Sequence, residues 1–193
     1  MRSFVAFFGL ILLGLAGIAA LAYPAFLLVH PYVDAPFHRV ASRVGMLILV
    51  IGFVIVARRL KVADKASMGY GLRRPLFLRE AGVGLALGVV TMLPIVFAML
   101  ALDMRDLRAG ITLDAALFAK LAFKGLLSGL AVAFIEETFL RGAMHSGIAR
   151  ESGARMAVLL TALVYSATHF IGKYRIPLDQ VGPGSGLDML GGS

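Results

Sequence analysis

The chain has 193 residues, of which 60% are hydrophobic and none is cysteine, with a mean hydropathy of +0.89 and a formal charge of +8. This composition is too apolar for an ordinary soluble domain and favours a polytopic α-helical membrane protein. The lack of cysteine excludes a disulfide framework and a thiolate metal site. In a membrane chain the positive charge indicates basic loops beside anionic lipid, not nucleic-acid binding.

The apolar runs predict five membrane spans, at about 4–29, 40–57, 80–102, 114–140 and 156–172. Each is near the roughly 20 residues that cross a bilayer, so we predict an all-α transmembrane helical bundle. The first run also resembles a signal peptide, with Ala20-Leu21-Ala22 as a cleavage site, but its length favours a retained helix. Within the third and fourth spans, the small-residue pairs Gly84/Gly88 and Gly125/Gly129 offer close contacts between helices.

The chain divides into three parts: membrane helices and a basic loop over 1–79, a core over 80–175, and a glycine-rich tail over 176–193. Seven lysines and arginines lie in the connection 58–79, so the positive-inside rule predicts that this loop is cytoplasmic. The tail is expected to be either a flexible loop or the start of a further element in a chain truncated at its C-terminus.

Two adjacent carboxylates and an arginine end the fourth apolar run, in the segment Glu136-Glu137-Thr138-Phe139-Leu140-Arg141. Ionisable groups inside membrane segments are costly and are therefore candidate functional residues. Residues four apart share a helix face, so Glu137 can pair with Arg141. Glu136 is turned about 100° from Glu137 and is less easily reached by Arg141. The spacing therefore predicts two different carboxylates, one held as an anion and one with a free oxygen.

The next apolar segment carries Tyr165 and His169, one helical turn apart on the same face. The most polar turn between these two segments is 151–153. Glu136 and His169 are each about 16 residues from it, which corresponds to equal depths of about 25 Å if both arms are helical. We therefore predict that the helix continues past Arg141 to about Arg150 and that Glu136 meets His169 across a hairpin.

A carboxylate beside a histidine in a partly dry cavity can activate a water molecule for attack on a carbonyl. Two carboxylates and histidines can alternatively hold a metal ion. An interfacial ion pair and a packing histidine would leave the same pattern without any chemistry. The residues alone leave these alternatives open.

Glu136-Glu137 with Arg141, followed by Tyr165 and His169, resembles the first two motifs of the CPBP intramembrane protease family, over roughly residues 80–175. That family includes the type II CAAX prenyl endopeptidases and bacterial relatives in protein maturation and bacteriocin self-immunity. The resemblance implies that Glu136 is the general base and that His169 orients the water or stabilises the oxyanion. It implies supporting roles for Glu137, Arg141 and Tyr165, although the family usually has Phe at the last of these positions.

The resemblance also implies a membrane-associated protein or peptide substrate, a multi-pass location in a bacterial plasma membrane, and a metal-free glutamic mechanism in preference to zinc. The family's later His-xxx-Asn-like motif is missing, because residues 171–193 contain neither histidine nor asparagine, and His145 is no substitute for it. We therefore expect weak or absent activity in this form. The alternatives are a non-catalytic membrane protein for partner binding or immunity, and a small proton-coupled transporter without visible repeat symmetry.

Overall fold

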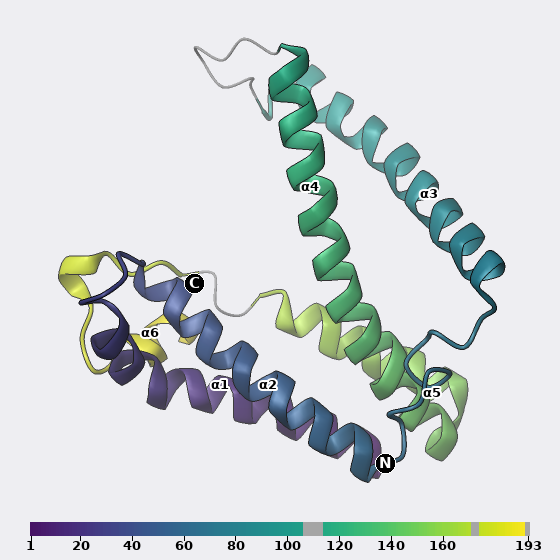
Figure 1. The fold of residues 1–193 in the computed structure, drawn as a ribbon, viewed down its shortest axis with the longest axis horizontal. Helices are drawn as coiled ribbons and strands as arrows, with labels where there is room; N and C mark the ends of the chain where they lie inside the picture. Colours follow the sequence, from purple (N-terminus) through teal and green to yellow (C-terminus); the bar gives the residue numbers. More distant parts are fainter. Residues whose placement is uncertain (106–113, 171–173, 192–193) are drawn as a thin grey trace. The chain divides into compact units, whose positions relative to one another are not determined.

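The computed structural model describes residues 1–105, 114–170 and 174–191, and these contain helices and no strand. The predicted all-α class is thus confirmed (Figure 1). The elements are α1 (Arg2–Val29), α2 (Phe37–Arg59), α3 (Arg74–Ala101), α4 (Ala115–Glu136), η1 (Glu137–Met144), α5 (His145–Thr168), η2 (Leu178–Gln180) and α6 (Ser185–Gly191).

The chain forms two compact units, and each is described by itself. Unit 1 comprises Met1–Gly69 and Glu136–Ser193, and unit 2 comprises Tyr70–Ile135. Unit 1 therefore contains α1, α2, η1, α5 and both elements of the tail, together with all five candidate site residues. Unit 2 contains α3 and nearly all of α4.

Four helical segments in the described part of the chain are long and apolar enough to span a membrane, namely α1, α2, α3 and the run Ala115–Thr168. The protein is therefore an integral membrane protein by length and composition. The last run contains two predicted spans, because Gly153 adopts a non-helical backbone with φ of 83° and breaks α5. Its second arm, 154–168, is shorter than the predicted fifth span and shorter than the roughly 20 residues that cross a bilayer.

Helices α1 and α2 form the main helical pair of unit 1, and glycines allow their close approach. A Cβ at Gly17 would lie 2.1 Å from the end of the Ile48 side chain, and one at Gly45 would lie 2.6 Å from that of Ile18. Small residues at a membrane helix interface let backbones approach and replace the missing hydrophobic driving force with van der Waals contact. The pair therefore forms a scaffold on which η1 and α5 pack.

Of the two expectations for the tail, a flexible loop or the start of a further element, its described part favours the second, because it contains η2 and α6. Met189 of α6 is buried against α1 and α2 in a cluster with Phe26 and Phe37. A Cβ at Gly186 would lie 2.6 Å from the carbonyl oxygens of Ile18 and Ala19, so the glycine permits backbone contact with α1. The glycine-rich composition of the tail does not reveal this contact, because the contact depends on α1, which is far away in the sequence.

In unit 2, the expected contacts of the glycine pairs are absent. A Cβ built at Gly84, Gly88, Gly125 or Gly129 meets no described atom within 4 Å, and neither α3 nor α4 contains a buried residue. The small residues are therefore not at a helix interface within this unit.

Within unit 2, the ring of Tyr70 stacks on that of Phe134, with ring centroids 5.9 Å apart, and also contacts the ring of Phe77.

Candidate active site

The helix hairpin predicted around the two motifs is confirmed. The helical path continues from η1 into α5 without interruption and breaks at Gly153, within the predicted turn. The two arms of this hairpin carry the two motifs, with Glu137 and Arg141 on η1 and Tyr165 on the far arm of α5. The two motifs can face each other only if the helix continues past Arg141, and it does.

Segment η1 is a π-helix, which the sequence did not predict. Its hydrogen bonds span five residues in place of four, so its turns are wider than those of an α-helix. Such segments are rare, usually short, and often found at functional sites. Here the π-helix begins at Glu137, immediately after Glu136, and contains Arg141. It therefore changes the directions of the motif side chains relative to an ideal α-helix.

The predicted ion pair is present, with Arg141 Nη1 3.1 Å from Glu137 Oε1. Both side chains are more than half exposed, at 70% for Arg141 and 53% for Glu137. Exposed pairs contribute at most about 1 kcal/mol in water. The ion pair therefore orients the Glu137 side chain more than it stabilises the fold. Glu136 takes no part in this ion pair.

Glu136 lies beside Tyr165 of the facing arm. The phenol lies close enough to the Glu136 carboxylate to be influenced by its charge, and it is also within range of the charges of Arg141 and Glu137. Both Glu136 and Tyr165 are half-buried. The hairpin thus brings four of the five predicted site residues together, and a half-buried carboxylate with a phenol neighbour is their centre.

His169 occupies a different place from the one predicted. It caps the end of α5, and its Nδ1 lies 2.8 Å from the carbonyl oxygen of Tyr165. Its ring contacts that of Tyr165, with centroids 4.2 Å apart. No interaction between His169 and Glu136 is found among the described residues. The equal-depth argument paired Glu136 with His169, whereas Tyr165 lies between them.

The aromatic contacts of η1 anchor the site to α1 and α2. The ring of Phe139 lies 5.5 Å from that of Phe7 and 5.4 Å from that of Phe53. Phe7 is one turn from Ser3, and Phe53 is just over one turn from Arg58, so the rings lie near one end of both helices. Phe139 is one turn from Glu136. The candidate site is therefore only a few turns from the start of α1 and the end of α2.

The basic loop after α2 packs against η1 and α5, and sequence reasoning missed these contacts. A Cβ at Gly142 would lie 2.6 Å from the carbonyl oxygen of Met68. One turn further on, the Ser146 hydroxyl donates to the carbonyl of Ser67 over 2.9 Å. Gly142 and Ser146 are small residues four apart on one helix face, which is a sequence signal for close approach. The loop thus supports the helix that carries Glu137 and Arg141.

The described residues do not fit a metal site built from three protein ligands. In the described ranges, no three His, Cys, Asp or Glu side chains come close enough together to hold a metal ion. His145, half-buried at the start of α5, does not complete such a set.

Comparison with known proteins identifies one family. Residues 118–187 match the family model described as type II CAAX prenyl endopeptidase Rce1-like. This segment contains both motifs, so the resemblance inferred from them is confirmed. No curated protein and no solved structure matches the chain significantly.

Proposed function

We propose that this protein is an intramembrane endopeptidase of the CAAX-protease-like type that cleaves a membrane-associated protein or peptide. The family match supports a peptidase at the coarse level. The observation that carries the finer proposal is the half-buried Glu136 carboxylate beside Tyr165, on facing arms of one hairpin. Ionisable side chains within membrane segments are costly, so a half-buried carboxylate there is a candidate functional residue.

In the proposed reaction, Glu136 is the general base. One carboxylate oxygen accepts the hydrogen bond of the Tyr165 phenol, and the other accepts a proton from a water molecule. That water attacks the scissile carbonyl, and the proton passes to the leaving amine as the carbon–nitrogen bond breaks. Glu137 and Arg141 keep each other in place as an ion pair, which prevents Arg141 from neutralising the base.

His169 is proposed as the group that orients the water or stabilises the oxyanion. Its present position against Tyr165 leaves the ring exposed at the end of α5.

The test compares Glu136→Gln with Glu151→Gln in proteoliposomes that contain quenched fluorescent peptides, one set farnesylated and one unmodified. Glu136→Gln removes the base while preserving shape, so we expect no cleavage above background. Glu151 lies at the turn of the same hairpin, and its variant should retain wild-type turnover. Cleavage by the Glu136→Gln protein at the wild-type rate would overturn the proposal. The two peptide sets report whether a prenyl group matters.

A second candidate is a non-catalytic membrane protein that uses the same fold to bind a partner. The observation that favours it is the lack of contact between Glu136 and His169 among the described residues. It predicts that the Glu136→Gln protein supports whatever cellular process depends on this chain. Loss of that process in the Glu136→Gln strain, with normal protein abundance, would exclude it.

A further inference from the structure

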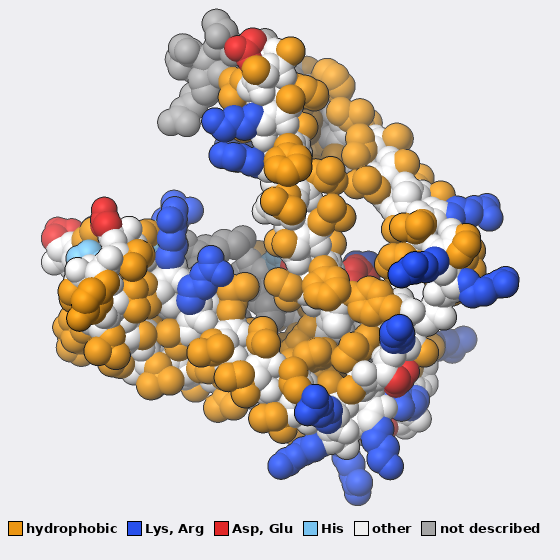
Figure 2. All heavy atoms as spheres, in the orientation of Figure 1, with side chains coloured by type: hydrophobic (Ala, Val, Ile, Leu, Met, Phe, Trp, Pro, Cys, Tyr) orange, Lys and Arg blue, Asp and Glu red, His pale blue; other side chains and the backbone are white. Residues whose placement is uncertain are grey.

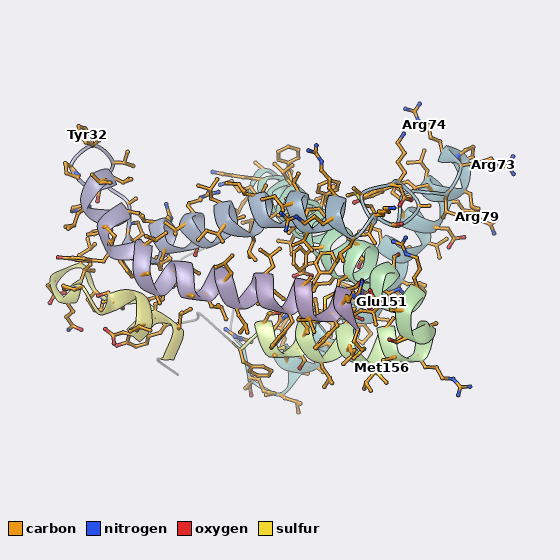
Figure 3. The ribbon with its side chains drawn as sticks, turned by 90° about the horizontal axis from the view of Figure 1, so that it is seen from below. Tyr32, Arg73, Arg74, Arg79, Glu151 and Met156 are labelled. Atoms are coloured by element: carbon orange, nitrogen blue, oxygen red, sulfur yellow. The ribbon has the colours of Figure 1, made fainter. Side chains whose placement is uncertain are left out.

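The two ends of unit 1 differ in charge. Ser3 and Glu151, and also Lys61 and Arg150, are in hydrogen-bond contact, so the start of α1, the end of α2 and the turn of α5 lie together. Figure 3 shows Glu151 and Tyr32 at opposite ends of α1. We call the first of these the basic end; its exposed basic side chains are Arg2, Arg58, Arg59, Lys61, Lys65, Arg150 and Arg155.

The basic end carries these seven side-chain cations and the amino group of Met1 against two carboxylates, a net charge of +6. The opposite end is balanced among the described residues, with three arginines and three aspartates: Asp34, Arg39, Arg43, Arg175, Asp179 and Asp188. Lys and Arg side chains are seen clustered where the N-terminus lies (Figure 2). Positive charge is thus concentrated at one end of the unit.

Neither carboxylate at the basic end neutralises a lysine or arginine side chain. Asp64 accepts hydrogen bonds from the backbone N–H and the hydroxyl of Ser67. Glu151 accepts from the backbone N–H and the hydroxyl of Ser3 and pairs with the amino group of Met1. Within the described ranges, the ion pairs are Met1 with Glu151 and Glu137 with Arg141. The side-chain cations of the basic end therefore have no carboxylate partner there.

An apolar belt borders the basic end and determines the kind of partner that fits it. Val5 is 65% exposed and Ile55 is 48% exposed, and both lie on helices long enough to cross a membrane. Hydrocarbon must cover this belt, so the cations next to it lie at the depth of the lipid headgroups. The anions available at that depth are phospholipid phosphates. A soluble acidic protein could not cover the belt and the cations together.

We propose that the basic end is a binding surface for anionic phospholipid headgroups. Arg58, Arg59 and Lys65 contact the headgroup phosphates, while Arg150 holds the loop in place through the carbonyl of Lys61. The surface distinguishes anionic from zwitterionic lipid because its unpaired cations attract net negative charge. It also fixes the leaflet in which this end of the protein lies. The proposal does not depend on protease activity.

The test measures the thermal midpoint of the purified full chain in nanodiscs of phosphatidylcholine with increasing phosphatidylglycerol. The variant Arg58→Gln/Arg59→Gln/Lys65→Gln removes three cations from the basic end. The matched control Arg39→Gln/Arg43→Gln/Arg175→Gln removes three from the balanced end. We expect phosphatidylglycerol to raise the midpoint of wild type and control equally, and to raise that of the first variant by less than half as much. High salt should reduce the wild-type gain, since exposed charges are screened.

Three outcomes would overturn the proposal: the same wild-type midpoint in both lipids, an equal loss of response in the control variant, or full reproduction of the gain by inorganic phosphate. The last would indicate a site for free anions in place of a lipid surface. Because all three substituted residues are exposed, the variant should fold as wild type does in pure phosphatidylcholine. If it does not, the single variant Lys65→Gln and the wild-type salt dependence give the same comparison.

Discussion

The contact between Gly142 and the basic loop provides a direct test of how the candidate site is supported. Substituting Gly142 by Ala places a methyl carbon 2.6 Å from the carbonyl oxygen and 2.8 Å from the carbonyl carbon of Met68. It also lies 3.0 Å from the carbonyl oxygen of Glu137. All three atoms belong to the backbone, so a side-chain rotation cannot relieve the clash. Either the loop or η1 must move.

Two opposing effects determine the magnitude. Overpacking of this kind costs about 1–3 kcal/mol, while replacing a helical glycine by alanine returns up to about 1 kcal/mol. We therefore expect Gly142→Ala to lose about 1–2 kcal/mol. In a chain of this size, 1 kcal/mol lowers the Tm by about 2–4 °C, so the expected decrease is about 2–8 °C.

Gly129→Ala is the matched control, because a Cβ at Gly129 on α4 meets nothing within 4 Å. It gains helix propensity without a clash and should leave the Tm unchanged or slightly raised. The assay is thermal unfolding of both purified variants in the same detergent. Equal Tm values for Gly142→Ala and Gly129→Ala would refute the reasoning. Both variants make the same substitution, and they differ only in whether the added methyl group meets the backbone of Met68.

Two further predictions concern the supports of the site. Phe139→Ala removes ring contacts with Phe7 and leaves a cavity. Because Phe139 is half-buried, we expect a loss of stability at the lower end of the range for buried aromatic residues, about 3 kcal/mol, measured by thermal unfolding. Phe123→Ala should change the stability little, because the Phe123 side chain is 66% exposed. Hydrogen bonds from Ser67 lower the pKa of Asp64 in the loop. The contribution of the ionised Asp64 carboxylate to stability is therefore fully present above the ordinary aspartate pKa, and it disappears as the pH falls through the lower pKa of the folded state. Asp64→Ala should therefore lower the Tm by more at pH 7 than in acid, where the carboxyl is protonated; an equal deficit at both would contradict this assignment.

The predictable part of this structure is the part that depends on local pattern. The apolar runs predicted the helices, and the polar turn at 151–153 predicted the break that Gly153 makes. The spacing of Glu137 and Arg141 predicted their ion pair, because four residues along a helix is a short-range relation. These relations hold whatever the rest of the chain does.

The unpredicted part depends on contacts between segments far apart in the sequence. The equal-depth pairing of Glu136 with His169 assumed α-helical turns along both arms, but η1 is π-helical and α5 ends at Thr168. Wider turns and a shorter arm change which residues face each other. Gly142 faces Met68 across 74 positions of sequence, and no local pattern could specify that partner.

Tyr165 is a departure from the motif pattern of the family that the chain resembles, and the fold places it beside Glu136. The family usually has Phe at this position, and a Phe ring could contact His169 but could not donate to Glu136. The Tyr165 phenol lies beside Glu136, so under the proposed function its hydroxyl would orient the carboxylate without the help of Arg141. Orientation of a general base affects the rate steeply, since catalysis requires near-ideal geometry of the reacting groups. The lipid surface uses none of these residues, so failure of the protease proposal would leave the proposal for the basic end untouched, and the reverse also holds.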